Sequence, residues 1–392
     1  MCGIVGYTGK SDCVDYLIEG LRLLEYRGYD SAGIAVISDK LLNKIEVRKE
    51  YGVLANLEES LTHGIVKGKV GIGHTRWATH GKPTQENAHP HWSQNYEVCV
   101  VHNGIIENHN ELKEELTSKG IKFLSETDTE VIPHLVCTYL KTGLTVKEAF
   151  LKTLSRLEGA FAIAMIAKET PDTIYATRKG SPLIAGFKDE NVFLASDFSP
   201  IVKHTREVLY LEEGDVIISN GTKSELMDIK GNPKEIKLVH EDVSNVSFGM
   251  DGYESYTLKE INEQSAILKR LIQLRLKKNT DGYNVVFDSI KTTPEIFKSI
   301  DRIYITGCGT AYHAAYIGKY YLEEFLDLPV EVILSSEFRY AKPKLNKRNL
   351  VIAVSQSGET ADTLASIVEA KKKGSKVLSV VNVLHSSIDR ES

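Results

Sequence analysis

The chain opens with Met1-Cys2-Gly3, which runs directly into the apolar stretch Ile4-Val5-Gly6-Tyr7. Removal of the initiator methionine, which the small Cys2 permits, would leave a thiol and a free α-amine on one residue. An α-amine titrates at about 7.7–8.0 and a thiol at about 8.5, so the amine can accept the thiol proton near neutral pH. The opening therefore predicts a nucleophile that carries its own base at the start of a strand, with Gly3 leaving room above the sulfur.

The composition is that of a globular chain whose 392 residues, 42% of them hydrophobic, suggest two domains. Its 48 basic and 53 acidic residues give a net charge of −5. That balance provides no broad cationic field, so we expect no nucleic acid partner. The five cysteines are scattered and form no C-x-x-C pair, which argues against a disulfide framework and a zinc site. No signal peptide or membrane span is predicted, and a reducing cytoplasm fits.

The N-terminal half consists of many short predicted strands and few helices. Apolar residues at helical spacing predict a helix over residues 13–24. Two further helices are expected over 110–119 and 128–140, the second with Asp128 in a position to cap it. Short β-rich runs predict strands over 4–7, 34–37, 45–48, 70–73, 98–101, 159–167, 173–177, 192–195 and 209–218. This pattern is typical of stacked sheets with helices on the outside.

The second half begins after a polar, glycine-containing stretch at 219–256 and an amphipathic helix marked by Leu258, Ile261, Leu268, Leu271 and Ile272. From about residue 300, strand, loop and helix alternate, which predicts a parallel sheet covered by helices. The expected strands are 302–306, 330–334, 350–354 and 376–383, and the expected helices are 311–325 and 361–373. Because open sheets of this kind usually carry about five strands or more, we expect this domain to be incomplete.

Polar groups that suit an amino acid amide cluster in the first half. Arg76, in the segment His74–Gly81, can hold a carboxylate with its planar fork. Asn103 and Gly104 follow a predicted strand and offer side-chain and backbone N–H donors for an oxyanion. Asp128 could hold an ammonium group, although a helix cap is an equally common role. The set predicts an α-amino acid substrate with a side-chain amide.

Six of the 12 histidines, His74, His80, His89, His91, His102 and His109, fall within one 36-residue stretch. A metal site is the alternative they raise. Their spacings match no metal-binding pattern, and the only nearby thiol, Cys99, lies in a predicted strand. We therefore expect no metal and interpret them as hydrogen-bonding side chains that shape loops.

Several separated blocks resemble the class II glutamine amidotransferase domain. They are Cys2–Gly6, Arg27–Gly33, His74–Gly81, His102–Asn108 and Ser125–Glu130. The resemblance implies the αββα sandwich of the N-terminal nucleophile fold. It also implies Cys2 as the nucleophile, Asn103 and Gly104 as the oxyanion hole, and Arg76, Thr79 and Asp128 as glutamine-binding residues. Trp77 would shield the site and the path of the ammonia.

Two loops of the second half point to a phosphate monoester. Gly307–Thr310 and Ser355–Thr360 each precede a predicted helix, whose first N–H groups attract an anion. A dinucleotide site is the alternative, but Tyr312 occupies the third glycine position of that motif. With Ser336–Tyr340, the loops resemble the sugar isomerase domain, a doubly wound parallel α/β fold. The resemblance implies sugar-phosphate contacts by Thr310, Ser355, Gln356, Ser357 and Thr360. That family commonly has serine where this chain has Ala311.

Together the two resemblances indicate the glutamine–fructose-6-phosphate aminotransferase family of hexosamine biosynthesis. They imply a glutaminase domain at 1–240, a linker and connecting helix at 241–290, and a truncated first sugar isomerase domain at 291–392. The implied substrates are L-glutamine and fructose 6-phosphate, without a cofactor, in a cytoplasmic enzyme that is a homodimer at full length. Since the family's Schiff-base lysine cannot be assigned within 1–392, we expect this chain to perform only the glutaminase half. The alternatives are a sugar-phosphate-binding regulator and a stand-alone amidase.

Overall fold

The protein divides into two compact units, Met1–Gly252 and Tyr253–Ser392. The structure, a computed structural model, describes residues 2–38, 44–62, 64, 67–78, 81–241, 252–280, 282–287, 290, 297–383 and 386–392. The division falls within the segment 241–290 that the sequence suggests as a linker. Among the described helices, none has the length and apolar character needed to cross a membrane.

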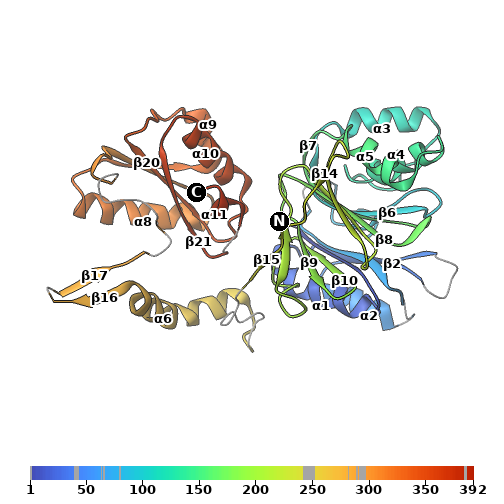
Figure 1. Cartoon of the computed structure of the whole chain (residues 1–392), viewed down its shortest axis with the longest axis horizontal. Helices are drawn as coiled ribbons and strands as arrows, with labels where there is room; N and C mark the ends of the chain where they lie inside the picture. Colours follow the sequence, from blue (N-terminus) through green and yellow to red (C-terminus); the bar gives the residue numbers. More distant parts are fainter. Residues whose placement is uncertain are drawn as a thin grey trace. The chain divides into compact units, whose positions relative to one another are not determined.

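The first unit contains two antiparallel sheets (Figure 1). The first sheet runs, in spatial order, β15 (Val239–His240), β11 (Glu207–Tyr210), β9 (Ile184–Lys188), β10 (Asn191–Ala195), β1 (Gly3–Thr8), β4 (Val70–Arg76), β2 (Ser31–Ile37) and β3 (Ile45–Tyr51). The second runs β14 (Pro233–Lys234), β13 (Ser224–Asp228), β12 (Asp215–Ser219), β8 (Thr170–Lys179), β7 (Gly159–Ala167), β6 (Val98–Ile106) and β5 (His91–Trp92). The strand that follows Cys2 is therefore an interior strand, paired with β10 and β4.

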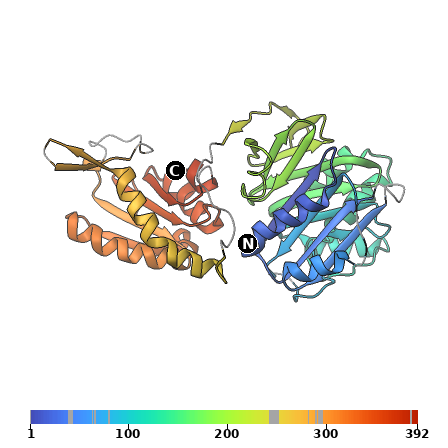
Figure 2. The same ribbon diagram turned by 90° about the horizontal axis from the view of Figure 1, so that it is seen from below.

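Helices cover both outer faces. The helices of this unit are α1 (Val14–Leu24), a 3-10 turn η1 (Glu25–Arg27), α2 (Leu54–Thr62), α3 (His109–Ser118), α4 (Val131–Leu140) and α5 (Val146–Leu154). α1 and α2 lie on the face of the first sheet that is turned to the viewer in Figure 2. α3, α4 and α5 pack on the outer face of the second sheet.

The alternation of side chains along the strands explains why these layers form. Successive residues of a strand point to opposite faces, so a strand covered on both sides has apolar residues at every position. Ile4 packs between the two sheets with Val101, whereas Val5 packs outward against Leu17 and Leu21 of α1. The expected αββα sandwich is confirmed.

Two predicted elements of the first unit were wrong in detail. The helix expected to start at Asp128 starts at Val131, and Asp128 does not cap it, because its carboxylate accepts the backbone N–H of Ile106 from β6. The single strand expected over 209–218 is two strands, β11 and β12, which belong to different sheets. A turn at Gly214, with a positive φ of 79°, separates them. The region 219–256, expected to be a turn-rich edge and a linker, also contributes β13, β14 and β15.

The second unit contains the expected parallel sheet, in the order β19 (Val330–Leu334), β18 (Arg302–Gly307), β20 (Asn349–Ser355) and β21 (Lys376–Val381). Its helices and hairpin are α6 (Tyr256–Arg275), β16 (Leu276–Asn279), β17 (Gly282–Val285), α8 (Thr310–Phe325), α9 (Ser335–Ala341), α10 (Ala361–Lys372) and α11 (Ser387–Arg390). The chain leaves β18 toward β19 on one side and continues from β20 to β21 on the other. Strand order therefore reverses between β18 and β20, the place where open α/β sheets bind ligands.

The helix α6 exists where amphipathic spacing predicts it. Its apolar residues are nevertheless exposed, with Leu268 at 60% and Ile272 at 59%. α8 has a similar exposed row, formed by Tyr316, Ile317, Tyr320, Tyr321 and Phe325. Periodicity predicted these helices, but not whether their apolar faces are covered.

Candidate active site

The candidate site of the first unit lies at the start of β1 and the end of β4, where the first sheet meets β6 of the second. Cys2 directly precedes β1, whose Gly3 pairs with Thr75 of β4 in the first sheet. Asn103 comes from β6 in the second sheet, and its Nδ2 donates to the Cys2 carbonyl oxygen at 3.0 Å. The sequence segments that were singled out separately thus meet across the two sheets.

Cys2 is half-buried, and its sulfur lies against the backbone of Trp77. Sγ accepts the Trp77 N–H at 3.2 Å, and the thiol is 3.5 Å from the Trp77 carbonyl oxygen. Burial raises the pKa of the Cys2 thiol, while the Trp77 N–H and the Arg76 guanidinium act in the opposite direction. Because the net direction is upward, the thiol needs a base to become a nucleophile.

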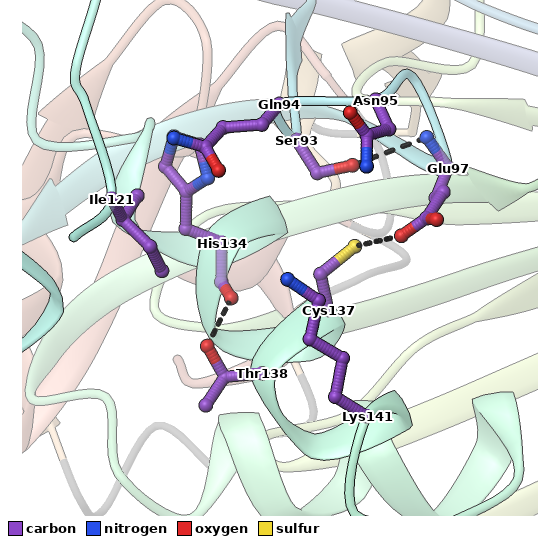
Figure 3. Close-up of a pocket in the computed structure, with 9 residues that line it drawn as sticks. All are labelled: Ser93, Gln94, Asn95, Glu97, Ile121, His134, Cys137, Thr138 and Lys141. Carbon is purple, nitrogen blue, oxygen red and sulfur yellow. Dashed lines mark hydrogen bonds between the residues drawn. The ribbon is translucent and has the colours of Figure 1, made fainter. Parts of the chain in front are cut away.

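Two other cysteines of this unit lack these features. Cys99 is fully buried, and burial raises the pKa of its thiol strongly. Cys137 of α4 borders a cavity of about 10 Å³, with its sulfur 3.5 Å from a Glu97 carboxylate oxygen (Figure 3). Burial raises the pKa of the Cys137 thiol to about 12, which keeps it protonated at neutral pH. Neither residue is placed like a nucleophile.

Asn103 is buried, and Gly104, directly after it, is exposed. Gly104 has a φ of 123°, a region that favours glycine. A Cβ atom there would come within 2.0 Å of the Ala160 carbonyl oxygen of β7. The close pairing of β6 and β7 therefore requires glycine next to the amide that faces Cys2.

Arg76 and Asp128 supply opposite charges to the same site. Arg76 is 4% exposed, and its guanidinium nitrogens lie 3.4 Å from the carbonyl oxygens of Gly81 and Lys82. Burial lowers the pKa of Arg76, whereas Cys2, Asp30 and Asp128 raise it, which places these groups within electrostatic range. Asp128 is buried, and one carboxylate oxygen accepts the Ile106 N–H at 2.7 Å.

Of the two other residues predicted to bind glutamine, Trp77 belongs to the described part of the chain and Thr79 does not. Trp77 is 44% exposed, and its ring meets the ring of Tyr29 edge-on, with centroids 5.3 Å apart. Thr79 lies outside the described residues. Asp30 belongs to the segment Arg27–Gly33, which the sequence singled out only by its family resemblance. Its carboxylate accepts the backbone N–H of Ala78 and so connects the segment after Trp77 to the loop before β2.

Glu130 organises the loop that carries Asp128, a role that sequence reasoning missed. Its buried carboxylate accepts the backbone N–H groups of Leu124 and Ser125, at 2.8 and 2.6 Å, and the Ser125 hydroxyl at 2.7 Å. Burial raises the pKa of Glu130, but these hydrogen bonds and His134 outweigh it, so the pKa is lowered overall. Because these partners lie within six residues of Glu130, the short block Ser125–Glu130 was the available sequence signal.

Four of the six clustered histidines form a buried group. The rings of His74 and His89 stack with centroids 4.1 Å apart. His91 lies 3.1 Å from the Thr127 hydroxyl, and His102 lies 2.8 Å from the Thr129 hydroxyl. Within the described ranges, no three histidine, cysteine or acidic side chains are arranged to hold a metal ion. The group connects the loop before β5 with the loop that carries Asp128.

The second unit has a candidate phosphate site at the sheet's reversal point. Thr310 begins α8 after β18, and the loop 355–360 follows the adjacent strand β20. Ser355 Oγ accepts the Gly358 N–H at 3.1 Å and lies 3.3 Å from the Thr360 hydroxyl. Ser357 Oγ accepts the Glu359 N–H at 3.2 Å, and Gln356 is exposed. Thr360 precedes α10 without capping it by its side chain, so the loop hydroxyls gather beside an uncapped helix start.

Two family profiles match the chain. The one described as "Glutamine amidotransferase domain" covers residues 74–203, and the one described as "SIS domain" covers residues 296–392. The two matches fall in the two separate units.

Curated relatives match the whole chain. Proteins named "Glutamine--fructose-6-phosphate aminotransferase [isomerizing]" from Clostridium tetani and Clostridium perfringens are 47% and 46% identical to it. Each alignment covers 100% of this chain and 63% of the relative, so the chain spans about 63% of their length.

The solved structures support the fold. The chain resembles a glutamine phosphoribosylpyrophosphate amidotransferase from B. subtilis with a TM-score of 0.52 and 21% identity, covering 97% of this chain and 81% of that one. At this identity the likeness concerns the fold alone.

Proposed function

Because the chain belongs to the glutamine–fructose-6-phosphate aminotransferase family, we propose that residues 1–392 hydrolyse L-glutamine at Cys2. In a chain of the relatives' full length, this ammonia would convert fructose 6-phosphate into glucosamine 6-phosphate. The observation that carries the proposal is the 3.0 Å hydrogen bond from Asn103 Nδ2 to the Cys2 carbonyl, because it brings an oxyanion donor beside the nucleophile.

The first half of the reaction forms a thioester. Once Met1 is removed, the α-amine of Cys2 takes the thiol proton, and the sulfur attacks the side-chain carbonyl of glutamine. The Asn103 amide and the Gly104 backbone N–H stabilise the oxyanion of the tetrahedral intermediate. The C–N bond then breaks, and the amide nitrogen takes the proton from the α-ammonium group and leaves as ammonia.

The second half releases glutamate. Water attacks the thioester carbonyl, with the α-amine accepting its proton, and the same donors stabilise the second oxyanion. The C–S bond breaks, the thiol regains a proton, and glutamate departs. Each step uses a group on Cys2 or its neighbours, so this half requires no cofactor.

Arg76 and Asp128 would select the substrate. We assign Arg76 to the α-carboxylate of glutamine and Asp128 to its α-ammonium group, and these buried opposite charges would disfavour amides that lack both. Thr79 is assigned to glutamine binding with them on resemblance alone. We assign Trp77, half exposed beside the sulfur, to shielding the intermediate and the path of ammonia.

The second unit is proposed to bind the sugar phosphate. The hydroxyls of Thr310, Ser355, Ser357 and Thr360, the Gln356 amide and the start of α10 would hold the phosphate of fructose 6-phosphate. The protein would act in the cytoplasm, where its five thiols stay reduced, and as a homodimer at full length, without nucleic acid or membrane partners. We retain 1–240, 241–290 and 291–392 as glutaminase, linker and first sugar isomerase segments.

A two-product assay tests this proposal. The chain with Met1 removed is given glutamine and fructose 6-phosphate, and glutamate and glucosamine 6-phosphate are measured separately. We expect glutamate without amino sugar. Formation of glucosamine 6-phosphate by residues 1–392 would contradict the proposal that this chain performs only glutamine hydrolysis. Turnover of simple amides at the rate of glutamine would favour the stand-alone amidase, and sugar-phosphate binding without any glutamate would favour a regulator.

A further inference from the structure

We propose that His74 is a positioning residue for glutamine hydrolysis, which fixes the Asn103 side-chain amide with its nitrogen toward Cys2. The inference rests on the proposed function and adds a residue that acts on the substrate only through Asn103. The observation behind it is that His74 Nε2 lies 3.0 Å from Asn103 Oδ1 and 3.1 Å from the His102 carbonyl oxygen.

The proton of His74 can be located without reference to Asn103. A backbone carbonyl oxygen only accepts hydrogen bonds, so the His102 oxygen requires a hydrogen on His74 Nε2. The same N–H faces Asn103, so the Asn103 atom 3.0 Å away must be the acceptor, Oδ1. Burial lowers the pKa of His74 to about 3, which keeps the ring neutral, with its single hydrogen on Nε2.

The other end of the amide gives the same answer independently. Asn103 Nδ2 lies 3.0 Å from the Cys2 carbonyl oxygen, which is also only an acceptor. A flipped amide would set oxygen against oxygen at Cys2 and leave the His74 N–H facing an amide N–H. Since an amide nitrogen carries two hydrogens, one can remain on the Cys2 carbonyl while the other meets the substrate oxyanion.

A second histidine, His89, packs against the His74 ring. The ring of His89 stacks on His74 with an interplanar angle of 15°, and His89 Nε2 lies 3.4 Å from the Thr129 hydroxyl. Both histidine rings are buried. His74 also pairs with Ile4 across β4 and β1, two residues along the strand from the nucleophile. The donor to Asn103 is therefore fixed by the same strand pair that fixes Cys2.

Two substitutions of His74 distinguish its hydrogen bond to Asn103 from its contribution to packing. His74→Gln can place an amide N–H near the position of Nε2, whereas His74→Asn is one methylene shorter and does not reach Asn103. We expect His74→Asn to lower kcat for glutamine hydrolysis about 10–100-fold, part of the effect of losing an oxyanion donor, with KM changed less than about twofold. His74→Gln should keep kcat within about threefold of the unchanged chain.

A double-mutant cycle with Asn103→Ala is the decisive readout. If His74 acts through Asn103, His74→Asn should cause no further loss in the Asn103→Ala chain. An equal loss in both backgrounds, or equal kcat for His74→Asn and His74→Gln, would overturn the proposal. If the unchanged chain makes no glutamate, or Cys2→Ala still makes it, the proposed function itself fails. The two kinds of failure are therefore distinguishable.

Discussion

The two candidate sites of this chain are built in opposite ways. In the first unit, buried side chains from two sheets converge, and Asn103, His74 and Asp128 each have a hydrogen-bond partner on a different strand or segment. In the second unit, one loop supplies most of the groups, and its hydroxyls bond to backbone N–H groups of the same loop.

The difference follows from what each site has to do. A site that attacks a carbonyl must hold donors at fixed positions for a charge that exists only in the transition state, and this needs rigid, buried support. A site that holds a phosphate meets a charge that is always present, and helix-start N–H groups with short hydroxyls can provide this from a local loop. We therefore expect point changes to reduce activity far more in the first unit than they reduce binding in the second.

The largest expected effect is the loss of the nucleophile. Cys2→Ala should lower glutamine hydrolysis by at least about 10⁴-fold, because it removes the thiol that forms the thioester. Glutamate release by the purified variant measures this. Cys137→Ala is the matched control and should retain activity, since the Cys137 thiol lies on α4 away from Asn103 and Arg76. Activity that survives Cys2→Ala, or an active preparation in which mass spectrometry still finds Met1, would contradict the mechanism.

The second effect concerns the oxyanion. Asn103→Ala should lower kcat by about 10²–10³-fold while KM changes little, because the amide acts mainly in the transition state. Steady-state kinetics with glutamine separates the two constants. A kcat that stays within twofold would remove Asn103 from the mechanism, and a large rise in KM alone would make it a binding residue.

The third effect is a loss of stability at acidic pH that we expect in the first unit. Burial lowers the pKa of His74 to about 3 and those of His89 and His91 well below 6.5. Below pH 6.5 the unfolded chain binds protons at these three imidazoles and the folded chain does not, so stability falls with falling pH. The loss is about 1.4 kcal/mol per pH unit for each proton, or about 4 kcal/mol per pH unit for all three.

Tryptophan fluorescence can measure this, because Trp77 and Trp92 both belong to the unit Met1–Gly252. Denaturant unfolding between pH 6.5 and 5.5 should show the loss, because carboxylates with a lowered pKa, such as Glu130, contribute only at lower pH. His91→Gln should reduce the slope by about a third, whereas His313→Gln, at an exposed position on α8, should not change it. A pH-independent unfolding free energy over this range would show that the histidine group is not buried in the neutral form.

The smallest effect is expected in the second unit. Ser355→Ala removes a hydroxyl that accepts the Gly358 N–H, and the affinity for fructose 6-phosphate should fall about 5–10-fold. Calorimetric titration of the chain with the sugar phosphate measures it. Ser379→Ala, in β21 outside both loops, is the control. A similar loss in both variants would indicate damage to the sheet rather than to a phosphate site.

The residues that do the proposed chemistry were predictable because their types are chemically specific. Cys2, Arg76 and Asp128 lie at strand or loop ends as expected, and the structure brings them close to Asn103. Asn103 and Gly104 were expected to follow a strand that ends at residue 101, but they lie inside β6 and pair with β7. The αββα order followed from strand patterns and from the resemblance of the sequence blocks. Thr79 lies outside the described residues, and the roles assigned to all these residues stay predictions.

The supporting residues were not predictable from local patterns. Asp128 was expected to cap a helix, but its partner is Ile106, 22 positions earlier, which no local rule can identify. Glu130 bonds to nearby Leu124 and Ser125, but its burial is not visible in the sequence. His74 acts through Asn103 of the other sheet, which depends on how the two sheets pack. The break between β11 and β12 was missed because Leu209–Ile218 is apolar on both sides of the turn at Gly214.

The glycine at position 104 has a consequence for mutational scanning. It is exposed, and burial-based rules predict tolerance of substitution at such positions. A Cβ there would meet backbone atoms of Ala160, which cannot rotate aside, and the positive φ would strain any other residue. In a library of all single substitutions, we therefore expect that no residue other than glycine is tolerated at position 104. Exposed Gly120 shares the strain of a positive φ, 82°, but a Cβ there meets nothing within 4 Å, so substitutions at Gly120 should reduce stability less than those at Gly104.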